Sequence, residues 1–281
     1  MLQKLSAFQA RKSLGQNFLH DENIARKIVR AIYPLPGESI IEIGPGFGVL
    51  TKYLVESGCR YVGVEIDDRL VPELEEKFDS FKNFELRHAD FRKLDLTNLT
   101  SNPASLRLVG NIPYHITSSI VFKAFKQHEL IRDMVLMVQK EVAERIVSAA
   151  GNKSYGILSV ISQTFSHPQI LFTVSPHVFT PKPEVESAIL RMDFSRKKQP
   201  PPEEPDFFRK MIKQAFGQRR KTLRNSLKSL GNLDHYIQSN NEIFNKRPEE
   251  LQVDELIGLA NMLNKVLKMT GTADFSNTLS G

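Results

Sequence analysis

Residues 39–150 alternate between short apolar runs and amphipathic stretches, and this alternation limits the fold more than any other feature of the sequence. We expect strands at residues 39–43, 61–66, 84–88, 106–109 and 134–138. We expect helices between them, at residues 50–57, 70–78, 117–125 and 140–150. Strands that alternate with helices form a mostly parallel sheet with helices on both faces. Two later apolar runs, residues 170–174 and 188–194, predict a hairpin at one edge of this α/β sheet.

A proline-rich segment at residues 196–205 divides the chain. Four prolines in the nine residues from Lys197 to Pro205 exclude a helix or a central strand there. We therefore predict an α/β domain over residues 1–195 and a small all-helical domain over residues 206–268. The small, polar residues 269–281 predict a disordered tail.

The net charge of +6 is unevenly distributed, because residues 1–195 are close to neutral. The stretch from Phe207 to Leu230 contains eight basic residues and no acidic one. Arg220, Arg224 and Lys228 recur at helical spacing, apart from an apolar stripe. A solvated surface helix is the simpler interpretation, but this charge excess favours contact with a polyanion such as RNA.

Several classes of protein are disfavoured by composition. The longest apolar runs have about five residues, whereas a membrane span needs about 20, so we expect no membrane segment. The single cysteine, Cys59, cannot form an intrachain disulfide or a cysteine-based metal site. The seven histidines show no paired ligand spacing, which predicts that no metal is bound. With no secretory signal in the first residues, we expect a cytoplasmic protein.

A glycine-rich loop follows the first predicted strand. Its glycines, Gly44, Gly46 and Gly48, would let the backbone approach a ligand closely, and Glu42 precedes them. A dinucleotide fingerprint would place its third glycine at position 49, which is Val49. The spacing is instead the form seen in S-adenosylmethionine (SAM) methyltransferases. A glycine-rich turn with no ligand is the alternative.

Acidic residues end the next two predicted strands. Glu65 lies 21 residues after Gly44, where an acid typically accepts hydrogen bonds from both hydroxyls of a ribose. Asp90 ends the following strand, and its carboxylate would accept from the amino group of adenine. Polar groups at successive strand ends meet at one edge of a parallel sheet, so together they predict a cofactor that contains adenosine.

The segment Asn111-Ile112-Pro113-Tyr114 follows the fourth predicted strand. The exocyclic nitrogen of adenine is a weak nucleophile, because its lone pair is delocalised into the ring. The side-chain oxygen of Asn111 and the carbonyl of Ile112 would accept its hydrogens and free that lone pair. A base must leave its stack to reach such a site, where Tyr114 would stack on one face and Phe179 is a candidate for the other.

With these motifs the chain resembles the ribosomal RNA adenine dimethyltransferases of the small-subunit type, from about Arg11 to Lys265. The resemblance rests on motifs that occur in the same order along the chain. They are residues 15–19, 42–48, Glu65, Asp90, 111–114, 179–187 and 218–227.

The resemblance implies a class I SAM-methyltransferase domain, which is Rossmann-like, followed by a small helical domain. It implies dimethylation of two adjacent adenosines in the loop of the hairpin near the 3′ end of small-subunit (16S) rRNA. The methyl donor would be SAM, with S-adenosylhomocysteine as product and no metal. The partner would be this rRNA or an immature small subunit during ribosome biogenesis, and we expect a monomer.

The resemblance also assigns site residues. Spacing alone favours a helix start at residues 17–19, whereas the family pattern makes Asn17 and Leu19 cofactor contacts. The expected cofactor contacts are Asn17, Leu19, Gly44, Gly46, Glu65, Ile66, Asp90, Phe91 and Asn111. The expected catalytic residues are Asn111, Ile112, Pro113, Tyr114 and Phe179. From the charge of residues 207–230, the expected RNA contacts are Arg219, Arg220, Lys221, Arg224 and Lys228.

The sequence departs from the family pattern at two positions. Leucine is common where Ile112 stands, and asparagine is common where His115 stands; neither change casts doubt on the reaction. A related large-subunit (23S) rRNA adenine methyltransferase that confers macrolide resistance shares several of the motifs, but the basic segment favours the small-subunit enzyme. An rRNA-binding assembly factor on a methyltransferase scaffold is the other alternative, and the intact Asn111 and Tyr114 argue against it.

Overall fold

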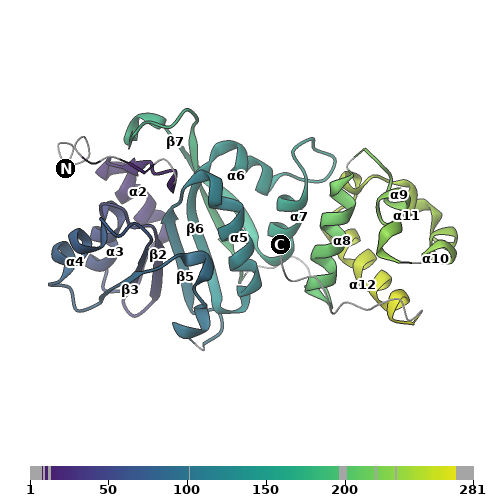
Figure 1. Cartoon of the computed structure of the whole chain (residues 1–281), viewed down its shortest axis with the longest axis horizontal. Coiled ribbons are helices and arrows are strands. Elements are labelled where there is room, and N and C mark those ends of the chain that lie inside the picture. Colours follow the sequence, from purple (N-terminus) through teal and green to yellow (C-terminus); the bar gives the residue numbers. More distant parts are fainter. Residues whose placement is uncertain are drawn as a thin grey trace. The chain divides into compact units, whose positions relative to one another are not determined.

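The computed structural model describes residues 8, 10–11, 14–100, 102–195, 201–218, 220–231 and 233–269. The chain divides into two compact units (Figure 1). The first comprises Met1–Glu144 and Ser166–Arg196, and the second comprises Arg145–Phe165 and Lys197–Gly281. Residues 145–165, which the sequence-based division assigned to the first domain, thus lie in the second unit. Residues 196–200 of the expected linker and residues 270–281 of the expected tail lie outside the described residues.

The first unit is built on a seven-stranded sheet with the order β4-β3-β2-β5-β6-β9-β7 (Figure 1). Its strands are β2 (Ser39–Ile43), β3 (Arg60–Glu65), β4 (Phe84–His88), β5 (Leu106–Asn111), β6 (Ile131–Gln139), β7 (His167–Val174) and β9 (Ser187–Asp193). The five strands from β4 to β6 are parallel, whereas β9 is antiparallel to both β6 and β7. The predicted mostly parallel sheet, with its antiparallel pair at one edge, is confirmed.

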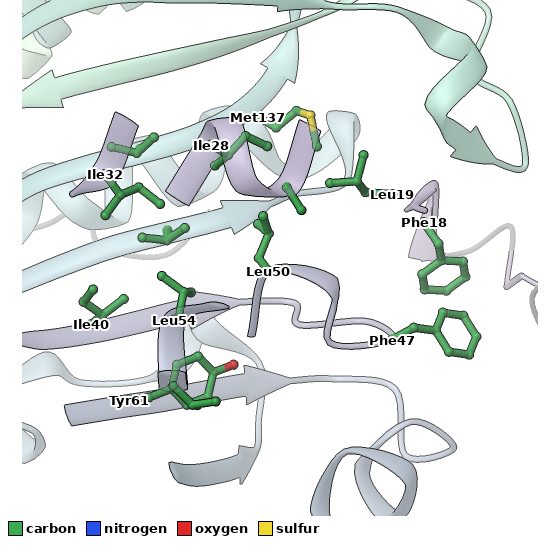
Figure 2. Packing of buried hydrophobic residues seen from close by; sticks show 14 of the residues in the cluster. Phe18, Leu19, Ile28, Ile32, Ile40, Phe47, Leu50, Leu54, Tyr61 and Met137 are labelled. Carbon is green, nitrogen blue, oxygen red and sulfur yellow. The ribbon is translucent and has the colours of Figure 1, made fainter. Parts of the chain in front are cut away.

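Helices cover both faces of this sheet. The connections contain α2 (Glu22–Ile32), α3 (Val49–Glu56), α4 (Val71–Phe78), α5 (Thr117–Lys126) and α6 (Lys140–Val147). On one face, α2 and α3 bury Ile28, Ile32 and Leu54 against the strand residues Ile40 and Met137 (Figure 2). Because side chains alternate along a strand, the neighbouring positions point to the opposite face, which α5 covers (Figure 1).

A second, two-stranded sheet lies beside the first. The strands β1 (Phe18–Leu19) and β8 (Phe179–Thr180) pair in antiparallel register, and His20 N donates to Val178 O at 3.0 Å. The helix start that spacing alone favours at residues 17–19 is therefore wrong, because these residues take a partner 160 positions away in the sequence. The pairing fixes the chain just before β1, which forms part of the site described below.

The second unit is helical within its described residues. It contains α7 (Ile157–Phe165), α8 (Pro205–Gly217), α9 (Leu223–Ser226), α10 (Asp234–Ser239), α11 (Asn241–Asn245) and α12 (Val253–Met269). The predicted apolar stripes of α8 and α12 are buried, from Phe208 to Ala215 and from Leu256 to Leu267. A single helix from α8 to residue 230 is not formed, because α8 ends at Gly217 and the extended Thr222 starts α9.

Candidate active site

A pocket opens at the carboxyl ends of β2, β3, β4 and β5. The strand β2 lies between β3 and β5, so the strand order reverses there, and ligands of open α/β sheets bind at such a switch point. Most of the lining comes from the segments that follow these strands and from the chain before and within β1. These segments are residues 14–19, 42–47, 64–66, 89–92 and 111–116.

The glycine-rich loop forms the floor of this pocket, and its three glycines have φ values of 67°, 60° and 72°. L-residues with side chains rarely adopt this left-handed region. A Cβ at Gly48 would lie 2.5 Å from Phe78 Cε2, and one at Gly46 would lie 3.2 Å from Phe18 Cδ1. A Cβ at Gly44 would meet no protein atom within 4 Å. Packing therefore excludes a side chain at Gly48 and leaves little room for one at Gly46. Gly44 borders open space.

Glu65 stands at the end of β3 and is 3 % exposed. Its Oε1 accepts hydrogen bonds from the backbone N–H groups of Ile66 and Asp67, both at 2.9 Å, and its Oε2 accepts from Gly46 N at 3.1 Å. Burial raises the pKa of this carboxyl group. Two carboxylate oxygens offer about four acceptor positions, so three backbone bonds leave about one on Oε2 for a ligand hydroxyl.

Asp90 follows β4 and caps the short helix η2 (Phe91–Lys93), where it accepts from Arg92 N at 2.9 Å. Its Oδ2 also pairs with Arg92 Nη2 at 2.7 Å, and the hydrogen bond from Arg92 lowers the pKa of Asp90. The neighbouring Phe91 is buried, whereas Ile66 is 42 % exposed. Both line the pocket, where Ile66 offers an apolar surface suited to a flat ring.

Asn111 ends β5 in the same lining. Its Nδ2 donates a hydrogen bond of 2.8 Å to the backbone carbonyl of Asn17. This bond assigns the donor end of the amide, and Oδ1 accepts no hydrogen bond from any residue that the structure describes. Asn111 therefore presents a free acceptor at the pocket.

Ile112, Pro113 and Tyr114 complete this wall of the pocket. Ile112 is 1 % exposed, and Pro113 precedes the short helix η4 (Tyr114–Ile116). The hydroxyl groups of Tyr114 and Ser187 are 2.7 Å apart and share a hydrogen bond. Burial raises the pKa of the Tyr114 phenol. The bond to Ser187 of β9 anchors the ring from outside the loop.

Phe179 differs from the other expected catalytic residues. Its side chain is 3 % exposed and packs in the hydrophobic core, and it does not contribute to the pocket lining. Within the β1–β8 pair it stands opposite Leu19, which does line the pocket. The structure thus brings residues 111–114 together at the pocket, but not Phe179.

Two residues that the sequence reasoning missed connect these parts. The Asp67 side chain is completely buried and accepts from Gln16 Nε2 at 2.7 Å and from Arg69 Nη2 at 2.6 Å. The hydrogen bond from Arg69 holds the pKa of Asp67 well below its usual range. Gln16 precedes Asn17, whose carbonyl orients Asn111. In the sequence, the only sign of this link is Asp67 itself, an acid two positions after Glu65. The spacing does not show that it pairs with Gln16.

Glu42 is a second buried acid of the lining. Its Oε2 accepts from Thr51 Oγ1 at 2.6 Å and from Tyr61 Oη at 2.7 Å. Burial raises the pKa of Glu42 to about 7. The sequence placed this residue ahead of the glycine loop but gave no partner for it.

Aromatic packing holds the rim where the glycine loop meets β1. The ring centroids of Phe18 and Phe47 are 4.8 Å apart in edge-to-face geometry, as the right side of Figure 2 shows. Phe8 contacts both rings, at 5.7 and 5.1 Å. Such pairs add about 0.5–1.5 kcal/mol beyond their burial, so they stabilise the position of the loop.

A second, more open cleft adjoins the pocket, and we refer to it as the outer cleft. It shares part of its wall with the pocket. Its lining residues are Ala10, Arg11, Gly15, Gln16, Asn17, Tyr114, His115 and Pro181.

The basic residues of the second unit lie around α9. Arg220, Lys221 and Lys228 are exposed, and Arg224 is half-buried and hydrogen-bonded to Asn241. Arg219 lies outside the described residues. Because the helix breaks at Gly217, the expected i, i+4, i+8 face is not formed, although the exposed cations remain close in sequence.

Among the residues that the structure describes, no three His, Cys, Asp or Glu side chains come together in a way that could hold a metal ion. No helix in this described part of the chain is both long and apolar enough to cross a membrane.

The fold and this pocket define a SAM-dependent methyltransferase. The structure is similar to that of a dimethyladenosine transferase from Plasmodium falciparum, with a TM-score of 0.72 and 23% identity over 90% of this chain and 98% of that one. It is also similar to the 23S rRNA methyltransferase ErmE, with a TM-score of 0.63 and 26% identity over 86% and 98% of the two chains.

The chain belongs to the ribosomal RNA adenine dimethylase family, whose model matches residues 7–265. It is 43% identical to the ribosomal RNA small subunit methyltransferase A of Cytophaga hutchinsonii, over 91% of this chain and 98% of the relative. It is 41% identical to the protein of that name from Pseudomonas syringae pv. syringae, over 92% and 96%.

Proposed function

We propose that the protein transfers methyl groups from SAM to the exocyclic N6 amines of two adjacent adenosines in the 3′-terminal hairpin loop of small-subunit rRNA. The observation that carries this proposal is the free acceptor of Asn111, which the Asn17 carbonyl orients in the lining of the pocket. The relatives named for small-subunit rRNA support the choice of substrate. We propose on the same grounds that the protein acts on immature small subunits in the cytoplasm.

The pocket residues fit SAM. Gly44 borders open space, Glu65 retains about one acceptor position for a ribose hydroxyl, and Ile66 offers an exposed apolar surface for adenine. The carboxylate of Asp90 would accept from the adenine amino group in addition to Arg92. When bound, SAM supplies a methyl group made electrophilic by its sulfonium.

The wall at residues 111–114 would activate the amine. Asn111 Oδ1 and the Ile112 carbonyl accept hydrogen bonds from its two N–H groups, which moves the nitrogen toward tetrahedral geometry and frees its lone pair. The methylated nitrogen then releases one proton to solvent. Tyr114 stacks on the base, with its hydroxyl tied to Ser187. Holding the reacting atoms about 3–3.5 Å apart and in line supplies much of the acceleration.

Phe179 would stack on the base only after a change in its side-chain position. Stacking on the second face of the base requires its side chain to rotate out of the core, where it is 3 % exposed. In its present position Phe179 belongs to β8, which pairs with β1 and so holds the chain next to the Asn17 carbonyl.

The second unit would bind rRNA phosphates. Arg220, Lys221 and Lys228 are exposed cations, and acidic residues are missing from this stretch of sequence. We include Arg219 and Arg224 in the same surface on sequence grounds. Charge of this kind gives affinity for RNA without reading its sequence.

A large-subunit rRNA substrate is the second candidate, because the fold is similar to that of the 23S rRNA methyltransferase ErmE. The identity to that enzyme is 26%, compared with 43% to the Cytophaga small-subunit relative. This difference favours the small-subunit substrate.

The test is transfer of labelled methyl groups from SAM to small ribosomal subunits that lack this modification, with the Asn111→Ala protein as control. We expect label in dimethyladenosine near the rRNA 3′ end, and none with the variant. Label on large-subunit RNA alone would favour the second candidate. Binding of SAM and RNA without transfer to either subunit would contradict the proposed activity and favour a role in assembly.

A further inference from the structure

The outer cleft is continuous with the proposed reaction pocket. Five residues line both: Gly15, Gln16, Asn17, Tyr114 and His115. An adenosine within an RNA chain remains covalently joined to its neighbours when it enters the pocket. Those neighbours must therefore leave the pocket along one of its open walls, and the outer cleft is such a wall.

The His115 side chain packs against the backbone at Gly15. A Cβ at Gly15 would lie 2.7 Å from His115 Nδ1 and 2.9 Å from Cε1, so the imidazole rests where any larger residue would collide. Gly15 has a φ of 58°, which also favours glycine. The ring is held by packing, since it makes no hydrogen bond or ion pair with any residue that the structure describes.

The other polar groups of the cleft are already engaged. The amide of Gln16 donates to Asp67 at 2.7 Å and accepts from Arg11 N at 2.9 Å. The Tyr114 hydroxyl bonds to Ser187. Arg11 pairs with Asp68 through Nη1 at 2.8 Å, and its side chain is 42% exposed. His115 is exposed as well, and it offers both a flat ring and polar atoms to a ligand.

We propose that the outer cleft binds the nucleotide next to the reacting adenosine, with the His115 ring stacked on its base. Histidine is among the side chains on which unstacked RNA bases stack. This inference rests on the proposed function, and it gives a role to the position where the sequence departs from the asparagine common in its family. The neighbouring base is then held while the first is methylated.

The test is a double-mutant cycle that combines a substitution in the protein with an abasic site in the RNA. The abasic site lies on one side of the target adenosine in a fluorescent hairpin, and equilibrium binding of this hairpin is measured. With the native protein, one abasic position should weaken binding about tenfold, the value of one stacked base. His115→Ala should weaken binding of the intact RNA by the same factor and leave less than a twofold effect of that abasic site. His115→Phe, which keeps a stacking ring, should restore most of the affinity, whereas His115→Asn should not.

His88→Ala is the matched control, because this exposed histidine ends β4 and lines neither cavity. The affinity of His88→Ala for SAM should equal that of the native protein, and RNA binding of all variants is compared at saturating S-adenosylhomocysteine. Independent, multiplying effects of His115→Ala and the abasic site would overturn the inference, as would unchanged RNA binding by His115→Ala. Failure of methyl transfer with all RNAs would contradict the proposed function. Because binding is measured without turnover, the cycle would still show whether the outer cleft binds the neighbouring nucleotide.

Discussion

Asn111 Nδ2 and the Asn17 carbonyl oxygen lie 2.8 Å apart, and they join residues that are 94 positions apart in the sequence. The bond determines which end of the Asn111 amide is free, since an amide that donates here must present its oxygen elsewhere. The acceptor that the reaction needs is thus set by the backbone before β1.

Asn111→Asp should lower the rate constant of methyl transfer by about 10²–10³, the usual loss when one positioned polar group of an active site is removed. The side chain keeps its size, but it can no longer donate to the Asn17 carbonyl, so two oxygens face each other. Single-turnover transfer from saturating SAM measures this loss. Activity within threefold of the native protein would show that the amide orientation does not matter.

Asp67→Asn should weaken SAM binding and slow transfer together, each by about tenfold, the cost of losing one charge-assisted hydrogen bond. The Asp67 carboxylate holds Gln16, which lines the pocket next to Asn17. Its loss should therefore loosen the segment that borders the cofactor and carries the carbonyl that orients Asn111. Calorimetry and single-turnover kinetics measure the two effects.

Asp68→Asn is the control for this variant, because Asp68 is 61% exposed and contacts Arg11 only at the surface. Adding Gln16→Glu to Asp67→Asn reverses the direction of the lost hydrogen bond. We expect this pair to recover part of the affinity, and no recovery would indicate that the charge of Asp67 acts through Arg69 instead.

Asp133→Ala should lower the free energy of unfolding by about 3–5 kcal/mol, because it removes one of the two carboxylates that pair with the buried Arg107 cation, the other being Glu38. Arg107 of β5 donates two hydrogen bonds to Asp133 of β6, at 2.7 and 2.8 Å, and both side chains are at most 4% exposed. Urea unfolding measures the loss. Arg132→Ala, which removes a half-exposed partner of Glu38, should change the free energy by less than about 1 kcal/mol.

The sequence predicted the sheet because each of its central strands is a nearly continuous apolar run followed by a turn signal. The same logic located Glu65 and Asp90, since parallel strands bring their carboxyl ends to one edge. It failed at residues 17–19, where the strand exists only through pairing with residues 179–180. Local spacing carries no information about a partner so distant.

The contacts within the site were beyond sequence reasoning for a related reason. Asp67 and Gln16 are each unremarkable locally, and only the fold brings their side chains to 2.7 Å. Phe179 was expected at the base, yet the β1–β8 pairing directs its ring into the core. The basic residues 220–228 are charged and largely exposed as expected, but they do not lie on one continuous helix, because α8 ends at Gly217.

Glu42→Gln should have a higher free energy of unfolding than the native protein at pH 8. This advantage of the variant should be about 1–3 kcal/mol larger at pH 8 than at pH 5. Burial raises the pKa of Glu42 from 4.5 to about 7 in the folded protein. Between these values the unfolded chain releases the proton while the folded chain keeps it, so the native protein loses stability as pH rises, by about 1.4 kcal/mol per unit of pKa difference. Glutamine still accepts from Thr51 and Tyr61 and does not ionise. Urea unfolding at the two pH values measures the difference, and a constant difference would contradict the raised pKa.

Replacing Arg220, Arg224 and Lys228 together with glutamine should weaken RNA binding and flatten its dependence on salt. Each phosphate contact contributes about 0.7–0.9 to the slope of log affinity against log salt concentration, so losing three should reduce the slope by about 2–3. Binding of the hairpin RNA is measured between 50 and 200 mM salt. Replacing the exposed Arg30, Lys82 and Lys126 of the first unit removes the same net charge and serves as control. If both triple variants reduce the slope equally, the effect is that of overall charge, because direct phosphate contacts near α9 require a larger change in the first set.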